Sequence, residues 1–382
     1  MLFAEIPQKD LDSALAVPEI ITAPGPEYDD AHRTSNMNAG IARTPKGRLW
    51  ACWITGENGK PADSEYALFM AAFSDDDGKT WSKPCMVIDP KNSPNGIPLR
   101  VLISNFWTDP LGRLWVFFDV GLGAFFDGRM GLWAARCDNP DAAEPCWTRP
   151  KRIYDGALHN KPLITKDGRW LLPAELYFRN YSPCAYLKDR HDYFPELDPI
   201  RGITILESTD QGETWNPIGR AHFPYNDGEE PILIENPDQS FRIFARTPEG
   251  MYESSSADKC RTWSEPIPAF KNPVTRFLIM RLQSGHLLFV RHGIDGEIAD
   301  RSQLRAWISD DEGKTWRGGM FIDSRQNTAY PDGIQTSDGH IYVTYEHGRD
   351  SDAEILLDIF TEEDVLNAKE TPIRRLINKA GK

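Results

Sequence analysis

The sequence has little positive charge, few cysteines and no long apolar run. Lys and Arg total 43 against 57 Asp and Glu, so the formal net charge is −14. A chain this acidic is not expected to bind nucleic acid or an anionic membrane surface, because both carry the same sign of charge. No segment reaches the ~18 apolar residues that a membrane-spanning helix needs. Neither nucleic acid nor a membrane is therefore expected as a partner.

The six cysteines form no Cys-x-x-Cys pair. This scatter favours reduced thiols over a disulfide framework, with a Cys137–Cys146 bond as the one alternative. No His/Cys/Asp cluster has the spacing of metal ligands and no glycine-rich loop leads from a strand into a helix, so no cofactor is expected. The N-terminal residues lack the basic segment and apolar run of a secretory leader. A cytoplasmic location is expected, or a secreted or periplasmic one if a leader has been removed.

One eight-residue pattern, Ser-x-Asp-x-Gly-x-Thr-Trp, recurs along the chain. The copies are Ser74–Trp81, Ser208–Trp215 and Ser309–Trp316, and a fourth copy that lacks the glycine is Ser256–Trp263. The pattern predicts a tight turn in which Asp accepts backbone N–H groups, Gly adopts a positive φ and Trp packs onto the next strand. Copies spaced by tens of residues indicate a repeat architecture.

A second repeat lies between these turns and consists of two apolar, β-rich runs joined by a short turn. Such hairpins are expected at Ile41–Trp53, Phe106–Phe118, Leu163–Ala174, Ile232–Arg246, Phe277–Arg291 and Asp332–Tyr345. Each is followed by a further strand pair, and in the second repeat Cys137–Trp147 substitutes for the recurrent turn. Six units of four strands predict an all-β fold, a six-bladed β-propeller.

The whole chain, residues 1–382, is expected to form this single domain. The last blade is predicted to close against the N-terminal segment Glu19–Thr22, which would leave no free sheet edge. A short C-terminal helix is predicted at Glu362–Glu370, because Thr361 can cap it and acidic residues fill its first turn.

The propeller also predicts where a site would lie. The residues that open each first strand, those that end each second strand and the loops that follow share one face, whereas the recurrent turns lie on the other. The shared face collects an unusually polar set: Asn38, Asp63, His159, Glu175, Glu230, Arg246, Arg276, Arg301, Tyr330 and Glu346. Charged groups that converge at the mouth of a propeller are costly unless they are paired or used, which favours a ligand site.

These residues resemble the sialidase (neuraminidase) superfamily over nearly the whole chain. The resemblance is carried by the recurrent Asp-box turns, by Ala329-Tyr330-Pro331-Asp332-Gly333 followed by Tyr345-Glu346, by Glu230 followed by Arg246, and by Asp300-Arg301-Ser302-Gln303-Leu304. The turns alone are specific for the propeller and not for an activity.

The resemblance implies a role for each matching residue. Tyr330 would be the nucleophile and Glu230, or adjacent Glu229, the carboxylate that polarises it. Asp63 would be the acid/base, although Glu57 and Glu65 share its loop. The resemblance further implies substrate-carboxylate binding by Arg246 and Arg301 and orientation of the first arginine by Glu346. By their position at the mouth of the propeller, Arg276, His159 and Glu175 are further candidates for substrate binding, with Arg276 as another arginine for an acidic sugar.

The sequence departs from the family at one important position. Sialidases open the first blade with Arg-Ile-Pro, but the corresponding residues here are Met37-Asn38-Ala39, so the first of three carboxylate-binding arginines is absent. Arg33, a few residues upstream, is the alternative source of that charge.

The resulting expectation is a sialidase-like retaining exo-glycosidase that releases a terminal, acidic sugar from a carbohydrate. Three alternatives stay open. One is a glycosidase of the same fold acting on another sugar, for example an arabinanase-like enzyme that uses Asp63 with Glu175 or Glu230, or one acting on a uronic acid or rhamnose. The others are a polysaccharide lyase that uses His159 or His292 with Tyr330, and a non-catalytic glycan-binding propeller.

Overall fold

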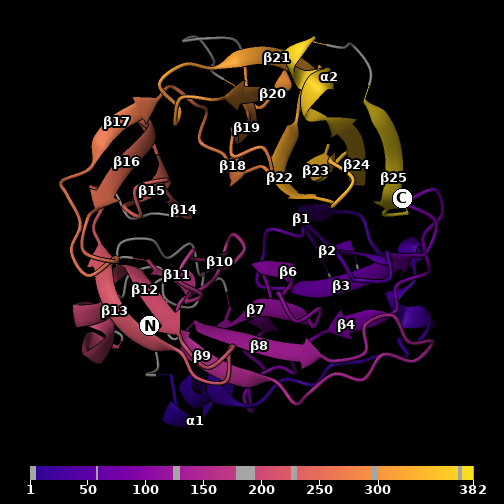
Figure 1. The fold of residues 1–382 in the computed structure, drawn as a ribbon. Coiled ribbons are helices and arrows are strands. Elements are labelled where there is room, and N and C mark those ends of the chain that lie inside the picture. The colour runs from indigo at the N-terminus through magenta and orange to yellow at the C-terminus, as the bar shows by residue number, and fades with distance from the viewer. Residues whose placement is uncertain are drawn as a thin grey trace.

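The computed structural model describes residues 6–56, 59–123, 130–177, 194–224, 230–293, 300–368 and 372–381. The strands of these residues form six antiparallel sheets arranged as blades around one axis (Figure 1). Five of the sheets have four strands, and the sheet of the second blade has five. The predicted all-β, six-bladed propeller is confirmed.

The first three blades run in chain order from the inner to the outer strand. Blade 1 comprises β1 (Asn36–Arg43), β2 (Leu49–Gly56), β3 (Ala67–Ser74) and β4 (Met86–Ile88). Blade 2 comprises β5 (Leu99–Arg100), β6 (Ser104–Thr108), β7 (Leu114–Leu122), β8 (Gly131–Cys137) and β9 (Lys151–Asp155). Blade 3 comprises β10 (Leu163–Ile164), β11 (Trp170–Leu176), β12 (Gly202–Ser208) and β13 (Asn216–Ala221).

The last three blades repeat the same order. Blade 4 comprises β14 (Ile232–Glu235), β15 (Phe241–Thr247), β16 (Gly250–Ser256) and β17 (Ile267–Phe270). Blade 5 comprises β18 (Leu278–Arg281), β19 (Leu287–His292), β20 (Leu304–Ser309) and β21 (Arg317–Asp323). Blade 6 comprises β22 (Thr328–Gln335), β23 (His340–His347), β24 (Glu354–Thr361) and β25 (Ile373–Lys379).

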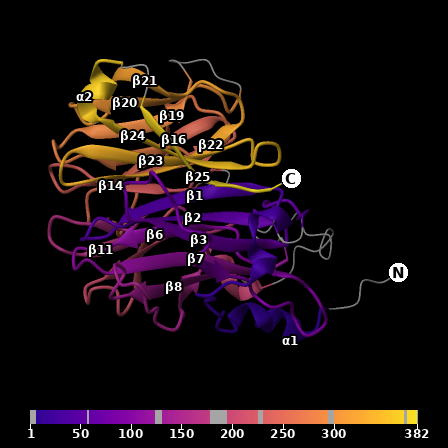
Figure 2. The same cartoon turned by 90° about the vertical axis from the view of Figure 1, so that its right-hand side faces the viewer.

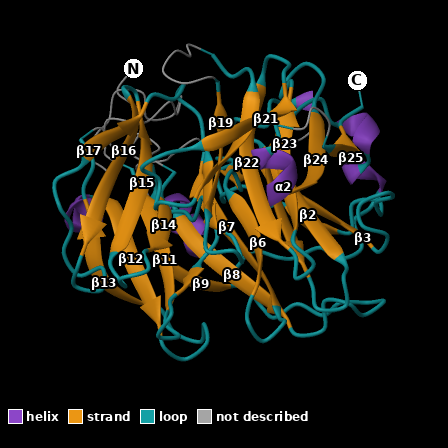
Figure 3. Ribbon diagram, turned by 45° about the horizontal axis from the view of Figure 1, so that its top comes forward, coloured by secondary structure: helices purple, strands orange, loops and turns teal. Residues whose placement is uncertain are grey.

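Helices are few and short in the described residues (Figure 3). They are the α-helices α1 (Gln8–Leu11) and α2 (Glu362–Leu366) and the 3-10 turns Asp12–Leu15, Pro26–Tyr28, Asp30–His32 and Pro195–Ile200. Thr361 and Asp364 form a reciprocal capping box that starts α2, as the sequence predicts. The helix ends at Leu366 rather than at Glu370, and residues 369–371 lie outside the described part of the chain.

The hydrophobic core is divided among the interfaces between neighbouring blades. Trp50 and Phe69 of blade 1 pack with Phe106 and Phe118 of blade 2 in one such cluster. Ring closure buries another cluster between blades 6 and 1, which lie side by side (Figures 1 and 2). Each blade therefore needs its neighbours to cover its faces, as in other closed repeat folds.

The last blade closes differently from the expectation. Its outer strand is β25, which pairs antiparallel with β24, and not Glu19–Thr22. Ile21 instead forms an isolated bridge to Val87 in blade 1. The chain continues after α2 as β25, which begins at Ile373, directly after Pro372. The prediction for Glu19–Thr22 is therefore wrong, because the chain supplies its own outer strand after α2.

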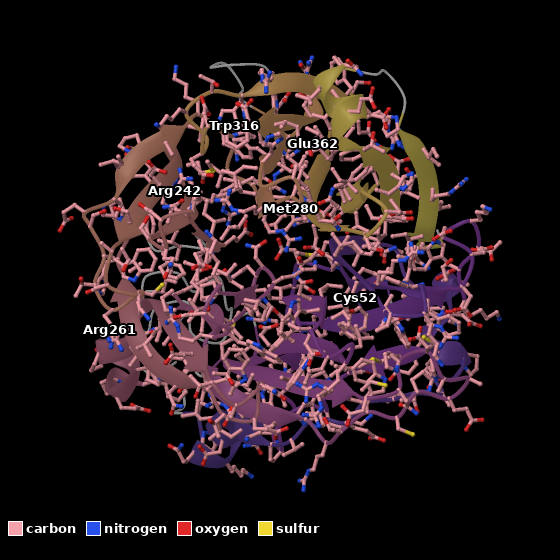
Figure 4. All side chains as sticks on the ribbon, viewed as in Figure 1. Cys52, Arg242, Arg261, Met280, Trp316 and Glu362 are labelled. Atoms are coloured by element: carbon pink, nitrogen blue, oxygen red, sulfur yellow. The ribbon has the colours of Figure 1, made fainter. Side chains whose placement is uncertain are left out.

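All four recurrent turns have the predicted geometry. In the first, Asp76 accepts hydrogen bonds from the backbone N–H of Thr80 at 2.9 Å and from its hydroxyl at 2.8 Å. Gly78 has φ +79°, and Cys260 has φ +69° at the equivalent position of the copy without glycine. Figure 4 shows Arg261 of that copy at the outer rim of the ring and Met280 of β18 near its middle. Cys137 and Cys146, the one disulfide alternative, are free thiols.

A cavity of about 1020 Å³ lies at the end of the axis that carries the hairpin turns. Its lining includes the turn around Gly47, the turn around Gly112 and the inner strand β18. The side chains of Lys161 and Asp332 form an ion pair in its lining. The predicted site residues, at the other end of the first and second strands, do not line this cavity.

Candidate functional site

Three residues at the site face hold a left-handed backbone. Asn38, Glu230 and Tyr330 have φ values of +54°, +49° and +57°. Carboxylates of neighbouring blades bind two of these peptides: Glu346 Oε2 accepts the Asn38 N–H at 2.5 Å, and Glu175 Oε2 accepts the Glu230 N–H at 3.0 Å. Non-glycine residues in this conformation cluster at functional sites, where the surrounding structure enforces them.

Tyr330 lies among four guanidinium groups. Arg246 Nη1 donates a hydrogen bond to the Tyr330 hydroxyl at 3.4 Å. The guanidinium carbons of Arg276, Arg301 and Arg349 lie 5.4, 5.6 and 5.2 Å from the centroid of its ring. The phenol is partly exposed, so a ligand that reaches it also meets this positive charge.

Glu230 reaches Tyr330 through Arg246. Its Oε2 lies 3.3 Å from Arg246 Nη1, the same nitrogen that contacts the phenol. Among the described residues Glu230 and Tyr330 make no direct hydrogen bond. Burial alone would lower the pKa of Arg246, but the nearby Glu230 and Tyr330 raise it above its ordinary value. The carboxylate, the guanidinium and the phenol thus form one short electrostatic chain.

Arg349, which the sequence analysis did not single out, links Glu346 and Asp63. Its Nε and Nη2 lie 2.9 and 2.8 Å from Glu346 Oε1, and its Nη1 donates to Asp63 Oδ2 at 2.9 Å. Burial would lower its pKa, but Glu346, Tyr330 and Asp63 together raise it above the ordinary value. Its position three residues after Glu346 was the sequence signal, because a residue so close to the end of β23 stays on the same rim.

Arg276 supports the floor of the site. It is almost fully buried and donates to the Asn38 side chain at 2.9 Å and to the carbonyls of His159, Ala39 and Tyr330 at 2.8 to 3.2 Å. These bonds tie the start of blade 1 to the start of blade 6. Its guanidinium is buried and bonded to the protein, and substrate contact by Arg276 stays a prediction.

His159 and Glu175 also lie beneath the surface. The His159 Nε2 atom is 3.1 Å from Glu175 Oε2 and 3.3 Å from the Tyr177 hydroxyl, and all three side chains are buried. Burial, with Glu175 nearby, raises the pKa of Tyr177 well above its ordinary value. Since Glu175 holds the Glu230 backbone, this group positions Glu230. Substrate contact by His159 and Glu175 stays a prediction.

Arg33 does not take the place of the missing arginine. It is buried, forms an ion pair with Asp30 and hydrogen-bonds Asn36 and Asn378, both at 3.4 Å. Burial lowers its pKa to about 10. Arg33 therefore ties the N-terminal segment to the C-terminal strand β25.

The site has two layers. The partly or fully exposed layer contains Asp63, Arg246, Arg301, Tyr330 and Arg349. The buried layer contains Asn38, His159, Glu175, Glu230, Arg276 and Glu346, which hold the exposed layer in place. Of the alternatives from the sequence, Glu57 and Glu229 lie outside the described residues, and Glu65 is half-buried in the loop of Asp63.

The described residues contain no group of three or more His, Cys, Asp and Glu side chains that could hold a metal ion. Within the same ranges, no helix has the length and apolar character that crossing a membrane requires.

Comparisons with known proteins agree with the propeller fold. The family described as BNR repeat-like domain matches residues 95–343, more than half of the chain, and the BNR/Asp-box repeat matches residues 72–83. No curated protein matches by sequence.

Similar solved structures include a Hadza microbial sialidase, Hz136 (TM-score 0.64, 18% identity, 88% of this chain and 67% of that one). Another is the intramolecular trans-sialidase of Ruminococcus gnavus (TM-score 0.63, 13% identity, 89% of this chain and 97% of that one). A third is the leech intramolecular trans-sialidase (TM-score 0.63, 12% identity, 89% of this chain and 70% of that one). At these identities the likeness shows the fold. The chain therefore belongs to the BNR repeat-like domain family and is a sialidase-like member of the Asp-box propellers.

Proposed function

We propose that the protein is a retaining exo-glycosidase that releases a terminal, acidic sugar, with Tyr330 as the nucleophile. The observation that carries the proposal is the partly exposed Tyr330 phenol, whose oxygen lies 3.4 Å from Arg246 and whose ring is surrounded by further guanidinium groups. Positive charge stabilises negative charge that develops on the phenol oxygen as it becomes a nucleophile.

In the first step the Tyr330 oxygen attacks the anomeric carbon and the bond to the leaving oxygen breaks. The phenol proton passes to Glu230, and Asp63, in its protonated form, gives a proton to the leaving oxygen. The phenol oxygen and Glu230 Oε2 both lie within 3.4 Å of the same Arg246 nitrogen, so Arg246 links the nucleophile to the carboxylate proposed to accept its proton. The product is a glycosyl–tyrosine ether and a free alcohol.

In the second step water attacks the same carbon from the side that the alcohol has left. Asp63 now accepts a proton from the water, and the bond to Tyr330 breaks as the phenol recovers its proton from Glu230. Two displacements at one carbon restore its configuration. A tyrosine suits an anionic sugar because the neutral phenol is not repelled by the substrate carboxylate.

The exposed layer favours an acidic sugar. Arg246, Arg301 and Arg349 are accessible, while the overall charge of the chain is −14. Guanidinium groups bind carboxylates with paired, charge-assisted hydrogen bonds, so a local cluster can recognise an anion despite the global charge. The solved structures of similar fold are named as sialidases and trans-sialidases, which supports the same class of substrate.

A lyase mechanism fits the described residues less well. The His292 Nε2 atom lies 2.8 Å from the Thr328 carbonyl, and burial lowers the pKa of this histidine to about 4. His159 is buried against Glu175 and Tyr177. Neither imidazole lies open to a polysaccharide, as an abstracting base must.

The test is hydrolysis of a panel of aryl glycosides, including the 4-methylumbelliferyl α-glycoside of N-acetylneuraminic acid and the β-glucuronide. Tyr330→Phe should lower kcat by about 1000-fold or more while the melting temperature is kept, because it removes only the nucleophilic oxygen. Tyr252→Phe is the matched control, since the Tyr252 hydroxyl also takes part in a side-chain hydrogen bond, to Glu249, but lies on the third strand of blade 4. Unchanged turnover in Tyr330→Phe would exclude this mechanism.

A further inference from the structure

The carboxylate that the family uses to orient its first arginine is occupied differently in this protein. Glu346 Oε2 accepts the backbone N–H of Asn38, the residue that stands where the arginine is missing. Its Oε1 accepts a hydrogen bond from Arg349 Nε and lies 2.8 Å from Arg349 Nη2, which completes the ion pair. The buried Glu346 therefore orients an arginine that comes from the other side, the loop after β23 instead of the start of β1.

The donors of Arg349 are divided between a buried and an exposed carboxylate. A guanidinium presents a side edge, formed by Nε and one Nη, and an end formed by the two Nη groups. The side edge is fixed by Glu346, which is 1% exposed. At the end, Nη1 binds Asp63, whose side chain is 53% exposed, at 2.9 Å. Asp63 thus occupies, as a carboxylate, a position that an incoming carboxylate could take.

The other arginines are placed for different tasks. Arg276 is buried in the floor, and Arg33 is paired on the far side of β1. Arg246 is held between Glu230 and the phenol. Arg349 is fixed at one edge and faces an exposed carboxylate at the other, so it combines a set orientation with an exchangeable partner.

We propose that Arg349 replaces the missing arginine and binds the substrate carboxylate at its Nη end in exchange for Asp63. The inference rests on the proposed function and names its specificity residue. A substrate carboxylate at this end meets Asp63 as a like charge, which favours release of Asp63 from the ion pair. The released side chain is then available to serve the leaving oxygen as the acid.

This exchange makes the carboxylate of the sugar part of the catalytic arrangement. A neutral sugar offers no carboxylate to Arg349, so Asp63 stays bound to Arg349 Nη1 and is not released toward the leaving oxygen. The carboxylate of an acidic sugar takes the place of Asp63 on Arg349. An acidic sugar should therefore have both a lower KM and a higher kcat than a neutral one.

The test compares Arg349→Ala and Arg349→Lys with wild type on the 4-methylumbelliferyl α-glycoside of N-acetylneuraminic acid and on its methyl ester, and likewise on the glucuronide and its ester. The matched control is Arg281→Ala, because Arg281 also makes a two-pronged ion pair with a glutamate, Glu312, but on the opposite face. Wild type should prefer the acid. Arg349→Ala should lose about 10- to 100-fold of that preference, the effect of one or two charged hydrogen bonds.

Arg349→Lys should recover only part of the preference, because it keeps the charge and loses the fork. A full acid preference in Arg349→Ala, or none in wild type, would overturn the inference while Tyr330→Phe still tests the proposed function. If no aryl glycoside is cleaved, calorimetric titration with free N-acetylneuraminic acid and free glucuronic acid decides the matter. Tighter binding of either acid to wild type than to Arg349→Ala supports the inference, and equal or absent binding of both contradicts it.

Discussion

The rim of recurrent turns and the opposite, site-bearing rim are built by contrasting means. Each recurrent turn is held by hydrogen bonds within its own eight residues. Asp210 accepts them from Thr214, four residues away, and the same contacts occur in the other three copies. Contacts at the site rim join distant parts of the chain. Glu346 and Asn38 meet across 308 residues and Arg276 and Asn38 across 238. Local contacts thus shape the blades, and contacts between distant parts of the chain shape the site.

The contrast indicates how such a propeller can change its chemistry. A repeated turn that is lost affects one blade, and the copy with Cys260 still has the same backbone shape. At the site, Arg349 of blade 6 binds the same Glu346 carboxylate that accepts the Asn38 N–H of blade 1, and we propose that it takes the role of the missing arginine. The fold tolerates this because its rim brings all first and second strands to one axis.

The largest effect is expected from Glu230→Gln at the site rim. The amide keeps the shape but cannot accept the phenol proton, so kcat/KM should fall by about 100- to 10,000-fold. The control is Glu235→Gln at the opposite end of the same short strand, where Glu235 accepts the Lys166 backbone N–H. Kinetics on the aryl glycosides distinguish them, and equal activity of the two variants would remove Glu230 from the mechanism.

The second prediction concerns stability and compares two ion pairs. Arg100 and Asp119, next to the site, are both 0% exposed, and Asp119 also accepts the backbone N–H groups of Leu102 and Ile103. Arg100→Ala should cost about 3–5 kcal/mol because it leaves a buried carboxylate without its cation. Arg317→Ala, which breaks an exposed pair with Asp310 in a recurrent turn, should cost less than about 1 kcal/mol. Denaturant unfolding measures both, and similar losses would contradict the contrast.

The third prediction separates backbone strain from crowding. Gly212 of a recurrent turn has φ +87°, and an added Cβ would lie 2.7 Å from the ring of Trp115 in the neighbouring blade. Gly168 of a hairpin turn has φ +84° with nothing within 4 Å. Gly168→Ala should cost about 1–2 kcal/mol from strain alone, and Gly212→Ala more. Thermal melting checks the order; equal values would show that the ring moves aside without cost.

The smallest effect is expected from acid acting on the recurrent turns. Hydrogen bonds from Thr80, Thr214, Thr262 and Thr315 lower the pKa of their aspartates from 3.8 to about 2. A lowered pKa in the folded state stabilises the fold above pH 3.8, and this contribution is lost as the pH falls through about 2. Melting temperatures of wild type and Asp210→Asn should therefore converge as the pH falls from 4 to 2. A constant gap would contradict the account.

Much of the fold could be predicted because its signals are local. The Asp, Gly and Trp of each turn lie within eight residues, and the paired apolar runs fix the hairpins. The outer strand β25 was missed because its burial pattern is mostly exposed and it follows a proline, so it has no clear alternation. The pairing partner of an outer strand depends on which segment is nearest after ring closure, which the sequence does not encode locally.

The site was predictable as a set of residues and not as a network. Tyr330, Arg246, Arg301, Glu230 and Glu346 could be placed on one rim by their position in the repeats. The structure shows which of the predicted residues are buried, and Arg276, His159 and Glu175 belong to the buried layer that supports the exposed one. Arg349 escaped notice because it follows a strand end in a short loop outside any repeated pattern.

The most direct test of the central claim is to trap the nucleophile. The protein would be incubated with 2,3-difluoro-N-acetylneuraminic acid, and its peptides examined by mass spectrometry. Loss of fluoride as the Tyr330 oxygen bonds to the anomeric carbon should add the glycosyl mass to the peptide containing Tyr330, and Tyr330→Phe should remain unlabelled. A label on Asp63 or Glu230, or an enzyme that cleaves the aryl sialoside yet labels no residue, would contradict Tyr330 as the nucleophile.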